Sequence, residues 1–118
     1  MGRLSTHVLD TANGIPGRGI KIELFRLGKN GERNFIKVEI TNDDGRTDTP
    51  LLDDKTCLAG QYELIFYIGD YFRDKGNQKQ EHVFLEEIPV RFTIADPSSR
   101  YHVPLVCSPW AYSTYRGS

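Results

Sequence analysis

Residues 20–40, IKIELFRLGKNGERNFIKVEI, contain two segments of alternating polarity on either side of a glycine-rich stretch. Apolar side chains occupy every second position in residues 20–24 and again late in residues 33–40, which is the pattern of strands with one buried face. The intervening residues 28–31 are typical of a hairpin turn. The stretch therefore predicts an antiparallel β-hairpin, with Lys37 and Glu39 pointing outward. The side chains that we expect to point inward are Ile20, Ile22, Leu24, Ile36, Val38 and Ile40.

Similar signals recur along the rest of the chain. One short helix is expected at residues 70–75, because Gly76 would stop it, and residues 77–81 are expected to form a polar loop. Turns rich in Gly, Pro, Asn and Asp separate the remaining segments. Further strands are expected at residues 4–9, 61–67, 83–95, 101–107 and about 110–116.

Prolines restrict two of these segments. Pro50 limits residues 47–58 to an edge strand or a short piece, and Pro104 predicts that the strand at 101–107 is an edge strand or carries a bulge. Seven or eight short strands with one helix indicate an all-β sandwich. With no internal repeat and no linker, we expect a single domain over residues 1–118.

The composition is that of an ordinary soluble domain. The chain has 118 residues, a formal net charge of -1 and a hydrophobic fraction of 38%, and its mean hydropathy is -0.47. Such a charge provides no field to attract nucleic acid, and no apolar run approaches the roughly 20 residues that span a membrane. The first residues lack the apolar core of a secretory signal, so we expect a cytoplasmic protein with free thiols at Cys57 and Cys107.

Three histidines are the first candidates for chemistry. His7 shares one face of the expected strand 4–9 with Ser5, and His102 lies in the strand at 101–107. Taken singly, a histidine within a strand is more often structural than functional. His82 falls in a polar segment, where we expect it to be solvated. The three lack the spacing of zinc-ligand pairs, so no metal is expected.

Of two notable arginines, only the second suggests contact with an anion. Arg46 follows the turn at 42–45 and, by itself, suggests a surface charge, whereas Arg116 is a permanent cation near the chain end that suits a planar anionic partner. The sequence has neither a glycine-rich phosphate loop nor a Gly-x-Ser-x-Gly elbow, which argues against nucleotide binding and the common hydrolase fold. The residues alone therefore lead no further than a small soluble β-sandwich.

Four segments go beyond that description. Residues 5–10 (STHVLD), 41–46 (TNDDGR), 101–105 (YHVPL) and 113–118 (STYRGS) together resemble the 5-hydroxyisourate hydrolases, the transthyretin-related enzymes of urate breakdown. The resemblance covers the full length of the chain, and the final Tyr-Arg-Gly-Ser is its most specific part. It implies a transthyretin-like β-sandwich.

The resemblance also implies a set of site residues. The catalytic residues would be His7, Arg46, His102 and Ser118, and the substrate-binding residues would be Arg46, Tyr115, Arg116 and Gly117. Members of the family often carry His-Tyr-His before Val-Pro, whereas Arg100 stands at the first of these positions here and could alter the electrostatics beside His102. Cys107, Trp110 and residues 80–89 also differ from the commoner family pattern.

The activity implied by the resemblance is opening of the ring of 5-hydroxyisourate to 2-oxo-4-hydroxy-4-carboxy-5-ureidoimidazoline, by histidine-assisted attack of water without a metal or other cofactor. The enzymes are homotetramers, dimers of dimers whose sites lie at a subunit interface, so the expected partners are the small-molecule substrate and identical subunits. Neither nucleic acid nor a membrane is expected. The alternative is a transthyretin-like protein that binds a small ligand without turnover.

Overall fold

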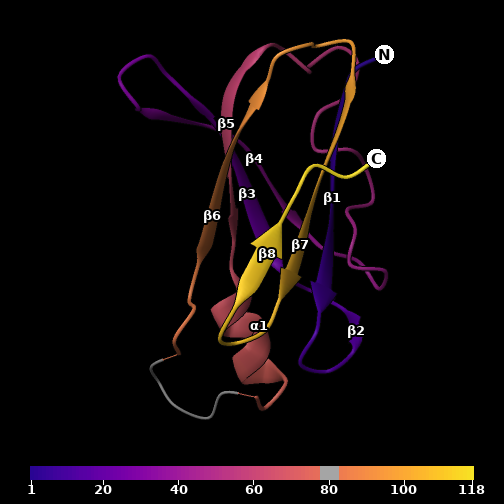
Figure 1. Cartoon of the computed structure of the whole chain (residues 1–118), viewed down its shortest axis with the longest axis vertical. Coiled ribbons are helices and arrows are strands. Elements are labelled where there is room, and N and C mark those ends of the chain that lie inside the picture. The colour runs from indigo at the N-terminus through magenta and orange to yellow at the C-terminus, as the bar shows by residue number, and fades with distance from the viewer. Residues whose placement is uncertain (78–82) are drawn as a thin grey trace.

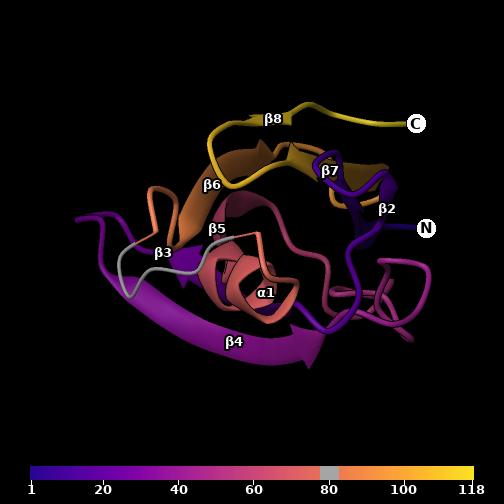
Figure 2. The same ribbon diagram turned by 90° about the horizontal axis from the view of Figure 1, so that it is seen from below.

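The computed structural model describes residues 1–77 and 83–118, which form two four-stranded sheets and one helix (Figure 1). The first sheet has the order β2 (Ile15–Pro16), β1 (Arg3–Asp10), β7 (Arg100–Cys107) and β8 (Tyr112–Thr114). The second has the order β4 (Arg33–Ile40), β3 (Lys21–Leu27), β5 (Gly60–Phe66) and β6 (Ile88–Ile94). The helix α1 (Ile68–Asp74) follows β5 and lies at one end of the sandwich (Figure 1); in the view from below it lies between β4 and the layer that contains β7 (Figure 2).

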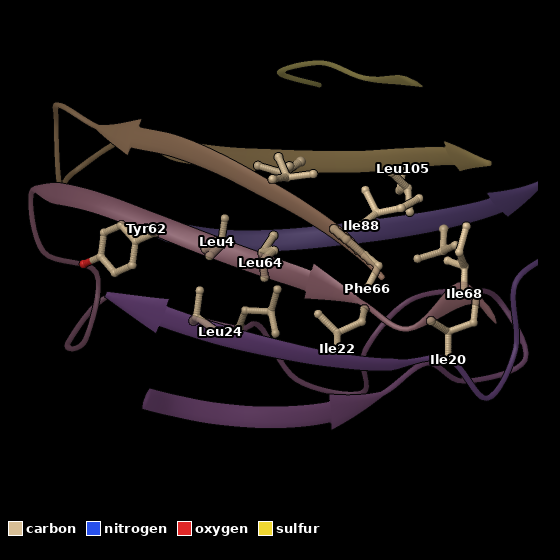
Figure 3. Packing of buried hydrophobic residues seen from close by; sticks show 14 of the residues in the cluster. Leu4, Ile20, Ile22, Leu24, Tyr62, Leu64, Phe66, Ile68, Ile88 and Leu105 are labelled. Carbon is tan, nitrogen blue, oxygen red and sulfur yellow. The ribbon is translucent and has the colours of Figure 1, made fainter. Parts of the chain in front are cut away.

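Alternating side chains from both sheets fill the space between them (Figure 3). Ile22 and Leu24 of β3 are fully buried, as the alternation predicts, and Leu64 and Phe66 of β5 pack beside them. Each large apolar side chain removed from water contributes roughly 1.5–3 kcal/mol to stability. The predicted transthyretin-like β-sandwich is thus confirmed for the described residues.

The pair formed by β1 and β7 positions the candidate site. These strands are parallel, and their register matches Arg3 with Arg100 through to Asp10 with Cys107. A parallel pair needs a long connection between its strands; here it is almost the whole chain. Segments near the two ends of the sequence are therefore brought side by side.

The prediction of which β4 side chains face inward is wrong. Leu24 pairs with Lys37 and Ile22 pairs with Glu39, and paired side chains share a face, so these two charged residues lie on the core side. Val38 and Ile40 are instead 47% and 56% exposed. The register is irregular between Leu24 and Phe25, and a shift of one residue exchanges the two faces of a strand.

The expectation for Pro104 is also wrong, because β7 lies between β1 and β8 rather than at an edge. The ladder between β7 and β8 covers only residues 105–107 of β7. At Pro104 the hydroxyl of Thr114 donates to the carbonyl oxygen at 2.8 Å. Pro104 lies just beyond the end of that ladder, so its missing N–H removes no bond from it, and a side chain satisfies its carbonyl oxygen.

Several expected boundaries shift by a few residues. Residues 83–87 are not part of β6, and β8 is shorter than expected. The turn-rich segment before β3 contains the two-residue strand β2, and α1 begins two residues earlier than expected. The predictions of a solvated His82 and of a loop at 78–81 lie outside the described residues.

Both cysteines carry free thiols, as expected, and both are buried. Burial and the negative charge of Asp10 raise the pKa of the Cys107 thiol to about 12. No helix in the described part of the chain is long and apolar enough to cross a membrane.

Candidate active site

The outer face of the β1–β7 pair carries both strand histidines. Along β1, buried Leu4, Thr6 and Val8 alternate with half-buried residues that face away from the core. Ser5 and His7 belong to this outer set, and His102 lies on the same face because it is paired with Ser5. The period of two in β1 and its parallel pairing therefore bring the two imidazoles onto one surface.

A turn docked against β1 holds His7. Its Nε2 lies 2.8 Å from the carbonyl oxygen of Asp44, and because a carbonyl only accepts, Nε2 carries the hydrogen and donates it. The carbonyl oxygen of Gly45 accepts a hydrogen bond from the backbone N–H of Val8, and the φ of Gly45 is 76°. A Cβ at this glycine would lie 2.4 Å from the Val8 carbonyl oxygen, so a larger residue would push the turn away from β1.

The side chain of Asn42 organises the same turn and places Arg46. Its Oδ1 accepts hydrogen bonds from the backbone N–H groups of Asp44 and Arg46, at 3.0 and 3.1 Å. The backbone N–H of Asn42 in turn donates to the carbonyl oxygen of Arg46. Arg46 is exposed, and with Ser5 it lines a groove of about 230 Å³.

His102 is held between a side chain and the C-terminal segment. Its Nδ1 lies 2.8 Å from the hydroxyl oxygen of Ser5. Burial lowers the pKa of His102 below its ordinary value, and the positive charges of Arg46 and His7 lower it further. A neutral imidazole is therefore favoured at neutral pH, and a neutral imidazole can accept a proton. Arg100 lines a separate groove with Arg3.

The last residues of the sequence pass over β7 at His102 (Figure 1). The backbone N–H of Gly117 donates to the carbonyl oxygen of His102 at 2.7 Å. A Cβ on Gly117 would lie only 2.6 Å from Cδ2 of the imidazole. Gly117 is therefore in close contact with the ring, and the exposed Ser118 follows it directly.

Arg116 and Tyr115 are directed to a different place. The guanidinium of Arg116 lies 4.2 Å from the centre of the Tyr101 ring and donates to the carbonyl oxygen of Arg100. Tyr115, which is exposed, and Arg116 line an apolar cavity of about 340 Å³ between β6, β7 and the C-terminal segment. Within this single chain, the structure thus brings together His7, Arg46, His102 and Gly117, but not the side chain of Arg116.

Ser5, Asn42 and Asp44 lie within the family motifs, but no role was expected for them. The sequence does contain a signal for the first two. Ser5 lies two residues from His7 and so shares its face in any strand. Asn42 opens a turn that ends in glycine, where an asparagine side chain commonly binds backbone N–H groups two residues onward.

Comparison with known proteins assigns the family. The model of the HIUase/Transthyretin family matches residues 4–117. The chain is 54% identical to 5-hydroxyisourate hydrolase 2 of Rhizobium meliloti, over 99% of this chain and 97% of that protein. It is 51% identical to 5-hydroxyisourate hydrolase of Pseudomonas aeruginosa, over 100% of this chain and 93% of the relative.

Solved structures agree on the fold. The crystal structure of (S)-allantoin synthase matches with a TM-score of 0.91 and 46% identity over 99% of this chain, which spans only 44% of that longer one. Transthyretin from Sparus aurata matches with a TM-score of 0.85 and 23% identity, over 98% of this chain and 96% of that one. The predicted resemblance is confirmed, and the chain belongs to the HIUase/Transthyretin family.

Proposed function

We propose that the protein is an enzyme that hydrolyses 5-hydroxyisourate to 2-oxo-4-hydroxy-4-carboxy-5-ureidoimidazoline in the breakdown of urate. The names of relatives about half identical to this chain support the reaction. The observation that carries the proposal is the convergence of two imidazoles and a guanidinium on the outer face of the β1–β7 pair. These groups suit a hydrolysis that needs proton transfer and charge stabilisation.

In the proposed reaction, water adds to the C6 carbonyl carbon, the bond between C6 and N1 breaks, and N1 leaves with a proton. His102 accepts the proton of the attacking water, because its lowered pKa keeps it neutral near pH 7. His7, whose Nε2–H is engaged by the Asp44 carbonyl, either orients the substrate while His102 passes its proton to N1, or donates an Nδ1 proton to N1 from its protonated form and is reprotonated at the expense of His102.

Arg46 and the C-terminal segment complete the proposed site. The Arg46 guanidinium binds substrate oxygens and stabilises the negative charge that develops on the attacked carbonyl. Ser118 positions the water or a histidine through its hydroxyl, Gly117 borders the substrate, and Tyr115 shapes the pocket. Arg116 would have to leave the Tyr101 ring to bind a substrate held at His102.

We also propose that the protein works as a homotetramer, a dimer of dimers, in the cytoplasm. The candidate site lies on an open sheet face, so a facing subunit would enclose it and exclude water. The edge strands β6 and β8 expose backbone groups that pairing between subunits would satisfy. Light scattering coupled to gel filtration tests this: a mass four times the 13.5 kDa of the chain is expected, and a monomeric active enzyme contradicts it.

The test of the reaction is the ultraviolet absorbance of freshly generated 5-hydroxyisourate with and without the protein. Faster decay with the protein is expected, and removal of either His7 or His102 is expected to lower turnover by about 10²–10⁴-fold, the range for positioned acid–base groups. A substitution that leaves the full rate removes that histidine from the mechanism.

The shared fold with transthyretin leaves a second candidate function, the binding of a small ligand without turnover. Decay at the spontaneous rate in the presence of the protein would favour this binding function.

A further inference from the structure

Ser5 makes a side-chain contact with one edge of the His102 ring. The two residues are paired across the parallel β1–β7 ladder, and the Ser5 hydroxyl oxygen lies 2.8 Å from Nδ1. Both residues are half-buried, on the outer face of the sheet. The contact thus depends on strand register, which a rigid ladder fixes, rather than on a mobile loop.

The C-terminal segment occupies the opposite edge of the ring. Nδ1 and Cδ2 are the two ring atoms bonded to Cγ, so they lie on opposite sides of the Cβ–Cγ axis. Gly117 stands so close to Cδ2 that an added Cβ would lie 2.6 Å from it. Ser5 and Gly117 therefore flank the imidazole, and the edge that carries Nε2 has no hydrogen-bond partner within residues 1–77 and 83–118.

We propose that Ser5 is a positioning residue for His102. Its hydroxyl oxygen accepts a hydrogen bond from Nδ1–H and holds the ring in the tautomer that keeps the lone pair on Nε2, where it receives the proton of the attacking water. This inference rests on the proposed hydrolysis and adds a residue to its machinery.

The hydroxyl matters because an imidazole is nearly symmetric in shape. A half-turn about the Cβ–Cγ bond exchanges Nδ1 with Cδ2 and Nε2 with Cε1, with little change in packing. A C–H group cannot replace Nδ1–H as a donor of comparable strength, so the Ser5 bond selects one of the two orientations. Burial, and then the charges of Arg46 and His7, disfavour the imidazolium, so the position of the single hydrogen on the neutral ring decides which nitrogen can act as a base.

The kinetic test compares three variants. Ser5→Ala is expected to lower kcat by roughly 2- to 10-fold, the effect of one hydrogen bond, with little change in KM. Its acid limb in the kcat–pH profile should move to lower pH, because a hydroxyl acceptor stabilises the charged ring more than the neutral one. Ser5→Thr keeps the hydroxyl and should restore the rate. Ser98→Ala, which removes a hydroxyl bonded to Asp96 in an exposed turn, is the matched control and should behave as wild type.

A second measurement needs no substrate. In ¹⁵N NMR spectra of the whole protein, the neutral His102 ring is expected to carry its hydrogen on Nδ1 in the wild type and to lose that preference in Ser5→Ala. Hydrogen on Nε2 in the wild type, or equal kcat values for wild type and Ser5→Ala, would overturn the proposal. A wild-type protein that does not accelerate substrate decay refutes the proposed hydrolysis instead, and the NMR result then decides the Ser5–His102 bond separately.

Discussion

Gly117→Ala tests whether the C-terminal segment and His102 act as one unit. The φ of Gly117 lies outside the left-handed region, so alanine adds a methyl group without backbone strain. That methyl carbon would lie 2.6 Å from Cδ2 of His102, where ordinary contacts begin at 3.4 Å. Either the ring or the segment must therefore move by about 1 Å, and a misplacement of about 1 Å can cost roughly 10²-fold in rate.

We expect kcat/KM for 5-hydroxyisourate to fall by about 10- to 100-fold in Gly117→Ala, with an unchanged melting temperature, because the residue lies at the edge of the fold and outside the core. Absorbance kinetics and circular dichroism measure the two effects. Ser113→Thr adds one methyl group to exposed β8 and serves as the control, with wild-type activity expected. A Gly117→Ala variant within twofold of wild-type kcat/KM would refute the packing argument.

Three further predictions concern charge and the chain end. Arg46→Lys keeps the positive charge but loses the planar fork of donors, so kcat/KM should fall; an unchanged value in the absorbance assay would remove Arg46 from the site. Deletion of Ser118, or a tag fused after it, should impair turnover while circular dichroism stays unchanged, and a fully active tagged protein would contradict a catalytic role for the C-terminal segment. The pKa of His102 is lower in the folded chain than its ordinary 6.5, so the unfolded chain binds this proton first as the pH falls. The His102 contribution to the free energy of unfolding should therefore decline below about pH 6.5; urea titrations of wild type and His102→Gln that show the same slope between pH 7 and 5 would refute this.

The fold could be predicted where burial and alternation agree. Ile22 and Leu24 are two residues apart on the central strand β3, so their side chains share a face. Because a central strand of a sandwich has one covered face, the alternation predicts that both side chains are buried. The same pattern misleads in β4, because an edge strand can turn either face outward and a register irregularity exchanged them. The prediction from Pro104 failed for a related reason. The β7–β8 ladder begins at residue 105, so the missing N–H of Pro104 does not disturb it. The length of that ladder depends on how the strands pair, which the residues around Pro104 do not reveal.

The candidate site was predicted from motifs, and its supporting contacts were not. His7 and His102 are separated by most of the chain, so only the family resemblance joined them before the structure was known. The bond of Asn42 to the turn and the bond of Ser5 to His102 depend on distances between strands and turns. Local sequence carries the residue types for such contacts but not the pairing that creates them.

The parallel ladder between β1 and β7 has a consequence for biosynthesis. Ser5 and His102 are 97 positions apart, and a ribosome adds about 5–20 residues each second, so β1 waits roughly 5–20 seconds for its partner. During that interval a nascent chain presents an unpaired strand edge to its surroundings. Chaperone capture and translation speed, rather than stability alone, would then govern how much of the protein matures in a cell.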